Sequence, residues 1–110
     1  MTRRLILTLA LCAAVPNLVL AQGMTMGGSP ADNANTEAMQ KMQSDMPKPS
    51  GDPDKDFVAM MIPHHQGAID MAKVELQYGK DPLLKTMAKM IISAQEKEIK
   101  KMRDWQNKHK

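Results

Sequence analysis

Two runs of helix-breaking residues limit what this chain can fold into. One run, P-K-P-S-G-D-P, occupies residues 47–53, and the other, G-K-D-P, occupies residues 79–82. Proline can neither continue a helix nor donate to a strand ladder, and glycine commonly ends a helix. Aromatic residues, which favour strands, make up only 3% of the chain, and β-branched residues are also few. We therefore predict an all-α fold in which each run joins two helices.

One short and two long helices are predicted. The short helix should span about 32–46, with Asp32 or Asn33 as its cap. The first long helix should span about 54–78, and the second should begin at Pro82, so that the two form an antiparallel hairpin. Each long helix has one apolar stripe at helical spacing. The stripes contain Phe57, Met61, His64, Ala68, Met71 and Tyr78 on the first, and Leu84, Ala88, Ile91, Met102 and Trp105 on the second.

A lone hairpin of this length leaves one apolar face uncovered. We expect the short helix, a second copy of the chain, or both to cover that face. The predicted architecture is thus a helical bundle built on the hairpin, and a homodimer is one predicted assembly.

The first 21 residues are predicted to be a cleavable secretory signal peptide. Arg3 and Arg4 precede an apolar run that ends at Val15, and V-L-A at 19–21 supplies the small residues that cleavage needs. The run is shorter than the roughly 20 residues that cross a bilayer as a helix. We therefore expect an exported, periplasmic protein that does not span the membrane.

Cleavage changes the composition of the working chain. It removes Cys12, the only cysteine, and two of the 15 Lys and Arg residues, which leaves 13 basic against 12 acidic residues. A near-neutral chain is poorly suited to nucleic acid, and a chain without cysteine has neither disulfides nor thiolate chemistry. Lipid attachment at Cys12 is the alternative, but Leu11 lies where lipidation signals have a small residue.

The densest group of metal-ligating side chains is M-M-I-P-H-H-Q-G-A-I-D-M-A, at residues 60–72. Residues four apart on a helix share a face, so Met60 lies beneath His64 and Met61 beneath His65. Thioether ligands select Cu(I), and imidazole binds copper in either oxidation state. The motif therefore predicts a copper site on the first long helix.

The hairpin brings ligands from the second long helix to the same end. If the turn is centred in the G-K-D-P run, facing residues have numbers that sum to about 161. Met102 then faces the level of Met61, and Glu98 lies near the histidines, where its carboxylate can orient an imidazole. Phe57 and Trp105 are expected to shield this end.

Three further methionines are candidate ligands. Met71 follows the histidines on the same helix and is either a ligand or flexible core filler. Met24 and Met26 form M-T-M in a Gly-rich stretch with no core to fill, which favours a metal-capturing role. We therefore expect residues 22–53 to be a flexible Met-, Gly- and Pro-rich segment that contains the short helix.

Residues 56–105 resemble the periplasmic family known as domain of unknown function 305, whose members include CopM-like copper-binding proteins. The resemblance rests on Phe57, the string M-I-P-H-H-Q-G-A-I-D-M-A at 61–72, Pro82, and the string Q-E-K-E-I-K-K-M-R-D-W at 95–105. It implies a ferritin-like helical bundle and binding of copper or silver ions through Met and His. Residues 54–110 are accordingly expected to form a helical hairpin metal-binding domain.

Copper capture is the function that these features predict. The expected ligands are Met60, Met61, His64, His65 and Met102 as the core site, with Met71, Met24 and Met26 as further ligands. We expect Cu(I), and also Ag(I) or Cu(II), to be bound for copper resistance or for transfer to other periplasmic copper carriers or exporters.

Enzymatic activity is not expected. The residues three before His64 and His65 are not glutamate, so the Glu-x-x-His motif of di-iron bundles is missing, as is the H-E-x-x-H motif of zinc hydrolases. The alternative function is a chaperone-like helical interaction module, because an adaptable Met-rich surface can bind apolar peptides.

Overall fold

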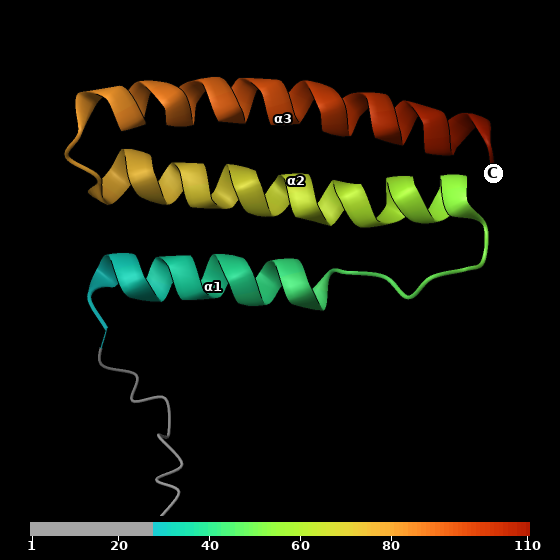
Figure 1. Cartoon of the computed structure of the whole chain (residues 1–110), viewed down its shortest axis with the longest axis horizontal. Coiled ribbons are helices and arrows are strands. Elements are labelled where there is room, and N and C mark those ends of the chain that lie inside the picture. Colours follow the sequence, from blue (N-terminus) through green and yellow to red (C-terminus); the bar gives the residue numbers. More distant parts are fainter. Residues whose placement is uncertain (1–27) are drawn as a thin grey trace, which may run out of the picture.

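The computed structural model describes residues 28–110, which form three helices and, within that range, no strand. The helices are α1 (Pro30–Ser44), α2 (Pro53–Tyr78) and α3 (Pro82–Lys108). Figure 1 shows them side by side in one antiparallel layer, with α2 between α1 and α3. The prediction of an all-α fold with a long hairpin is therefore confirmed. The predicted signal peptide, Met24 and Met26 lie outside the described residues.

The two long helices begin as predicted. Each has proline at its first position and an aspartate cap just before it, Asp52 for α2 and Asp81 for α3. Each cap carboxylate accepts hydrogen bonds from two backbone N–H groups of the first turn. These groups have no partner inside the helix, so the caps stabilise both helix starts.

The short helix α1 begins two residues earlier than predicted. Its cap is Ser29, not Asp32 or Asn33, because the Ser29 hydroxyl accepts a hydrogen bond from the Asp32 backbone N–H. In return the Asp32 carboxylate accepts from the Ser29 backbone N–H at 3.0 Å. This reciprocal capping box fixes the helix start. The helix ends at Ser44, so that Met46 lies just beyond it.

The loop between α1 and α2 is fastened to the first turn of α2 by Asp56. One carboxylate oxygen accepts from the Ser50 hydroxyl at 2.6 Å and from the Ser50 backbone N–H at 2.7 Å. The other accepts from the backbone N–H of Gly51, whose φ of +93° suits glycine. These bonds, led by the Ser50 hydroxyl, hold the pKa of Asp56 below its usual value. The loop therefore returns the chain to α2 at a fixed point.

The central helix α2 contacts both neighbours, whereas α1 does not contact α3. A buried stripe of α2, formed by Val58, His65, Ile69 and Ala72, follows helical spacing along the contact line with α3, the α2–α3 seam. In the contact line with α1, the α1–α2 seam, Met42 lies directly on Gly67. A Cβ atom placed on Gly67 would be 2.7 Å from the Met42 sulfur, so glycine permits this close approach.

The two faces of the layer differ in polarity. One face has an open hollow of about 600 Å³, the apolar hollow, to which all three helices contribute. The lining of the apolar hollow consists of Ala31, Asn35, Ala68, Met71, Ala72, Val74, Glu75, Tyr78, Gly79, Leu84, Met87, Ala88 and Ile91. Hollows on the opposite face are lined mainly by charged and amide side chains, such as Gln66, Asp70 and Arg103. The layer therefore has one solvated face and one apolar face.

The half of each predicted apolar stripe that is nearer the turn between α2 and α3 faces the apolar hollow. Met71 and Tyr78 of α2, and Leu84 and Ile91 of α3, line it and are still 37–48% exposed. Because α2 contacts a helix on each side, its two seam-facing surfaces lie to either side of the stripe. An apolar face thus remains uncovered within residues 28–110, because α1, one of the two expected covers, contributes only Ala31 and Asn35 to the lining. None of the described helices has the length and apolar character to cross a membrane.

Candidate metal site

His65 is the most constrained of the predicted ligands. Only 8% of its surface is exposed, and its Nε2 lies 2.5 Å from Oε2 of Glu98 on α3. A carboxylate only accepts, so Nε2–H donates, and in the neutral tautomer with this bond Nδ1 carries the lone pair. That Nδ1 is buried and has no hydrogen-bond partner among the described residues. A buried lone pair with a carboxylate on the other ring nitrogen is the common arrangement of a metal-ligating histidine.

The contact between His65 and Glu98 fixes the register of the hairpin. Their numbers sum to 163, close to the predicted sum of about 161. Met61 lies four residues before His65, and Met102 lies four residues after Glu98. In an antiparallel pair these steps run in the same direction, so Met61 and Met102 form the next facing pair one turn along the α2–α3 seam. Both methionines are partly buried.

The five predicted core ligands fall into two groups. Adjacent residues on a helix point about 100° apart, and the rings of His64 and His65 have centroids 6.3 Å apart with an interplanar angle of 61°. His65 faces α3, whereas His64 is exposed. Met60 shares the face of His64, because it lies four residues earlier. The register therefore places Met61 and Met102 next to His65 along the α2–α3 seam, and helical spacing turns Met60 and His64 about 100° away from it.

The remaining predicted ligands lie elsewhere. Met71 lines the apolar hollow beside Met87 and is 45% exposed. It lies seven residues beyond His64, which is about 10 Å along the helix axis at 1.5 Å per residue. The structure therefore places Met71 with the hollow and apart from the histidines.

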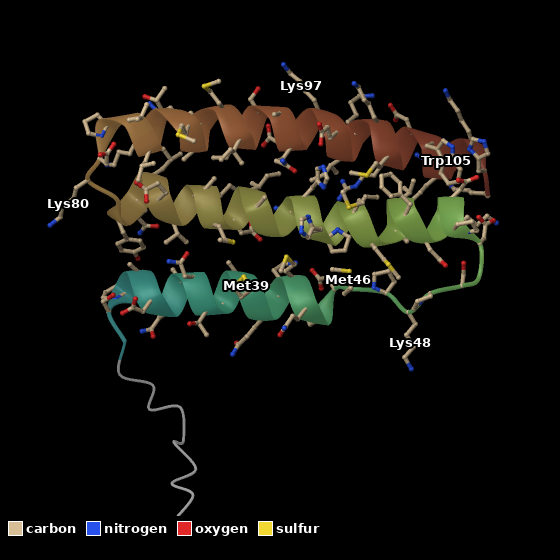
Figure 2. The ribbon with its side chains drawn as sticks, viewed as in Figure 1. Met39, Met46, Lys48, Lys80, Lys97 and Trp105 are labelled. Atoms are coloured by element: carbon tan, nitrogen blue, oxygen red, sulfur yellow. The ribbon has the colours of Figure 1, made fainter. Side chains whose placement is uncertain are left out.

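The predicted aromatic shield is only partly formed. Phe57 is 60% exposed, which leaves it largely in solvent. Trp105 is partly buried and stacks on His109, with ring centroids 4.2 Å apart. The His109 ring nitrogen Nδ1 also lies 2.7 Å from the Trp105 carbonyl oxygen. The two residues together cover the C-terminal end of α3, where Figure 2 labels Trp105.

Two exposed Lys–Asp pairs among the described residues involve no predicted ligand. Lys100 donates to Asp104 at 2.7 Å, and this bond lowers the pKa of the Asp104 carboxyl. On α1, a hydrogen bond to Asp45 raises the pKa of Lys41. Both pairs span one helical turn and are exposed, so each contributes little to stability.

Oxygen- and nitrogen-rich metal clusters are not found in the part of the chain that the structure describes. No three His, Cys, Asp or Glu side chains there lie close enough together to hold a metal ion. Thioethers are outside that set of donors. The absence of such a cluster among residues 28–110 therefore does not concern a site that combines histidine with methionines.

Sequence reasoning missed the part that α1 plays beside the histidines. Met46 was expected to end the short helix, but it lies in the turn just beyond α1, and the Met42–Gly67 contact puts that turn at the level of Pro63. Gly67 is the signal that could have shown this, because a glycine inside a helix often marks the close approach of another backbone.

A comparison with known proteins finds one relative from a virus. The chain is 45% identical over 49 residues to an "Uncharacterized protein L153" of Acanthamoeba polyphaga mimivirus. The aligned part covers 44% of this chain and 32% of the viral protein, so the chain matches about a third of that relative.

The family match is more extensive. The family described as "Domain of unknown function (DUF305)" matches residues 15–106, which include all of α1 and α2 and most of α3. The match thus contains both seams and every predicted ligand that the structure describes. On this match, the chain belongs to the DUF305 family.

Proposed function

We propose that this protein binds Cu(I) in the α2–α3 seam through Met61, His65 and Met102. The observation that carries the proposal is the Nδ1 atom of His65, which is buried and unpartnered while Glu98 holds Nε2. A buried nitrogen without a hydrogen bond is costly, and a metal ion at this position would remove the cost. Glu98 would fix the ring orientation and raise the basicity of the nitrogen ligand.

The ligand types favour a soft ion. Two thioethers and one imidazole suit Cu(I) and its analogue Ag(I) better than hard cations, which prefer oxygen. The role would be capture for copper resistance, or for transfer to another copper carrier or exporter, with no bond chemistry on a substrate. Export to the periplasm would fit these ligands, because thioethers do not form disulfides there as thiols do.

A competition assay tests the proposal. The protein is titrated without oxygen against a chromogenic Cu(I) chelator, alongside His65→Ala and the double variant Met61→Leu/Met102→Leu. Leucine conserves volume, and circular dichroism checks that each variant is folded. Met90→Leu is the control, because Met90 is 67% exposed and lies away from the seam. We expect both site variants to lose competition and the control to retain it. Failure of the wild type to withdraw Cu(I) would overturn the proposal.

A second candidate function is favoured by the apolar hollow. Its volume of about 600 Å³ and its Met87 and Leu84 lining would suit the apolar face of a helix from a partner protein. Sedimentation of the wild type and of Ile91→Lys tests this candidate. A monomeric wild type that binds a labelled amphipathic helical peptide, with loss of binding in Ile91→Lys, would support it. A dimer that Ile91→Lys dissociates would show that a second copy fills the hollow, and would overturn this candidate.

A further inference from the structure

The motif that contains the two histidines has the same pattern twice. Met60 and His64 form one Met-x-x-x-His pair, and Met61 and His65 form another, shifted by one residue. A shift of one residue turns the second pair by about 100° around α2. The pair with His65 faces α3, so the pair with His64 is turned about 100° away from α3.

The stripe that contains His64 leads to α1. Met60, His64 and Gly67 are spaced by four and three residues, so they share one face of α2. Gly67 is a point of close approach to α1, since its backbone lies against the side chain of Met42. Met60 and His64 therefore lie along the α1–α2 seam, toward the end where α1 stops.

Met46 reaches this seam from the other helix. One turn beyond the contact of Met42 with Gly67, Met46 comes opposite Pro63, the neighbour of His64. Two further facts agree with this position. The backbone N–H of Met46 still bonds to the Gln43 carbonyl, so the chain continues to turn there. The next residue, Pro47, lines one hollow together with Pro63.

Figure 2 shows the same gathering of sulfur. Met46 is labelled at the end of α1 beside α2, and several sulfur atoms lie between these two helices. His64 is exposed and forms no hydrogen bond with the described residues, so its ring nitrogens are available. Met46 is 37% exposed, and Met60 is partly buried.

The geometry points to a second soft-metal site in the α1–α2 seam, formed by Met46, Met60 and His64, which takes Cu(I) or Ag(I) independently of the His65 site. This inference rests on the proposed function for the identity of the metal. The two sites differ in access, because His64 is exposed whereas His65 is 8% exposed. The outer site therefore exchanges metal with solvent or a carrier faster than the inner one.

The test counts bound Ag(I), a redox-stable substitute for Cu(I), by native mass spectrometry under conditions that keep the chain folded. The variants are His65→Ala, the double variant Met46→Leu/Met60→Leu, and the control Met39→Leu/Met90→Leu, which removes two other exposed methionines. We expect each site variant to bind one Ag(I) fewer than the wild type, and the combined variant to bind two fewer. The control should bind as many ions as the wild type.

Each variant is compared with the wild type, so Ag(I) ions bound by other methionines contribute equally to both counts and cancel in the difference. If Met46→Leu/Met60→Leu binds as many Ag(I) ions as the wild type, with the same affinities, the second site is overturned. If His65→Ala still loses one ion in that case, the proposed function stands. The reverse result, loss in the double variant alone, would overturn the His65 site and support the outer one.

A second readout reports ligation directly. In protein labelled with 13C at the methionine methyl groups, Ag(I) should shift the Met46 and Met60 signals, and His65→Ala should retain both shifts. If these two signals do not move while those of Met61 and Met102 do, the seam with α1 holds no metal. A purely structural role for Met46 predicts that result, so the measurement separates packing from ligation.

Discussion

His65 and Glu98 join α2 to α3 through a contact of 2.5 Å, the one side-chain hydrogen bond between these two helices among residues 28–110. The histidine is buried, whereas the Glu98 side chain is 56% exposed. The carboxylate can therefore orient the ring from the solvent side while Nδ1 faces the interior. The same contact sets the hairpin register that brings Met61 opposite Met102.

Glu98→Gln should weaken Cu(I) binding without abolishing it. The amide oxygen can still accept from Nε2–H, but it has no charge to raise the basicity of Nδ1. Loss of such an outer partner commonly costs about 10- to 100-fold in metal affinity, and we expect a loss in this range. Chelator competition measures the change.

Glu96→Gln is the matched control for this variant, because Glu96 is an exposed carboxylate on the same helix. It should bind Cu(I) as the wild type does. Equal affinities for Glu98→Gln, Glu96→Gln and the wild type would mean that the contact with His65 is unrelated to metal binding.

Gly67→Ala should destabilise the fold because of the Met42 side chain. The new Cβ would be 2.7 Å from the sulfur and 3.1 Å from the Cβ of Met42, so the Met42 side chain and the backbone that carries it have to give way. Overpacking costs about 1–3 kcal/mol, whereas alanine gains up to about 1 kcal/mol over glycine in a helix. We expect a net loss of about 1 kcal/mol in the free energy of unfolding, measured with urea.

The Met42→Ala background provides the check. Met42→Ala removes the sulfur and the Cγ, the two nearest atoms, and keeps the Cβ at 3.1 Å. Most of the clash is relieved, so Gly67→Ala should be less destabilising in this background than in the wild type by about 1 kcal/mol. The same effect of Gly67→Ala in both backgrounds would contradict the close contact between α1 and α2.

The Asp56 carboxylate should make the free energy of unfolding depend on pH in the acid range. Its folded-state pKa lies below the ordinary value of 3.8, because Ser50 and Gly51 donate hydrogen bonds to the carboxylate. Because the pKa is lower in the folded state, the stabilisation is complete above the pKa of the unfolded state. It is lost as the pH falls through the pKa of the folded state. Asp56→Asn should therefore be less stable near pH 7 and lose less stability between about pH 5 and pH 2.

Urea midpoints measured across this pH range test the Asp56 prediction. Asp54→Asn removes a charge from the same helical turn, although the Asp54 carboxylate accepts no hydrogen bond from the described residues. It should retain the acid-dependent loss of the wild type. Parallel pH profiles for Asp56→Asn and the wild type would show that the loop contacts do not persist in solution.

Local chemistry explains which parts of the fold were predictable. The cap at Asp81 and the break at 47–53 depend on neighbouring residues alone, so the sequence sufficed for both. The predicted start of α1 was wrong because Ser29 and Asp32 are both residue types that cap helices. Only their reciprocal hydrogen bonds show that Ser29 is the cap. The choice between two capping residues depends on backbone and side-chain geometry, which composition does not give.

The positions of the site residues along the helix axes could be predicted, but the neighbours that they meet around those axes could not. Antiparallel register follows from the position of the turn, so the levels of Met61 and Met102 were close to the predicted ones. The divergence of about 100° between His64 and His65 follows from helical spacing, but the position of α1 beside α2 follows from tertiary packing at Gly67. For the same reason Met46 could not be joined to the histidines from spacing.

Oxidation of methionine should report which thioethers bind metal. Hydrogen peroxide converts exposed methionine to its sulfoxide, and a sulfur lone pair bound to Ag(I) is not available for this reaction. With saturating Ag(I), peptide mass spectrometry should show slower oxidation of Met61 and Met102. Met90, which is 67% exposed and outside both proposed sites, should oxidise at the same rate with and without Ag(I). In His65→Ala the protection of Met61 and Met102 should disappear, because the nitrogen ligand is lost. Protection that persists in His65→Ala, or that extends equally to Met90, would show that Ag(I) acts on the whole protein and not at the α2–α3 seam.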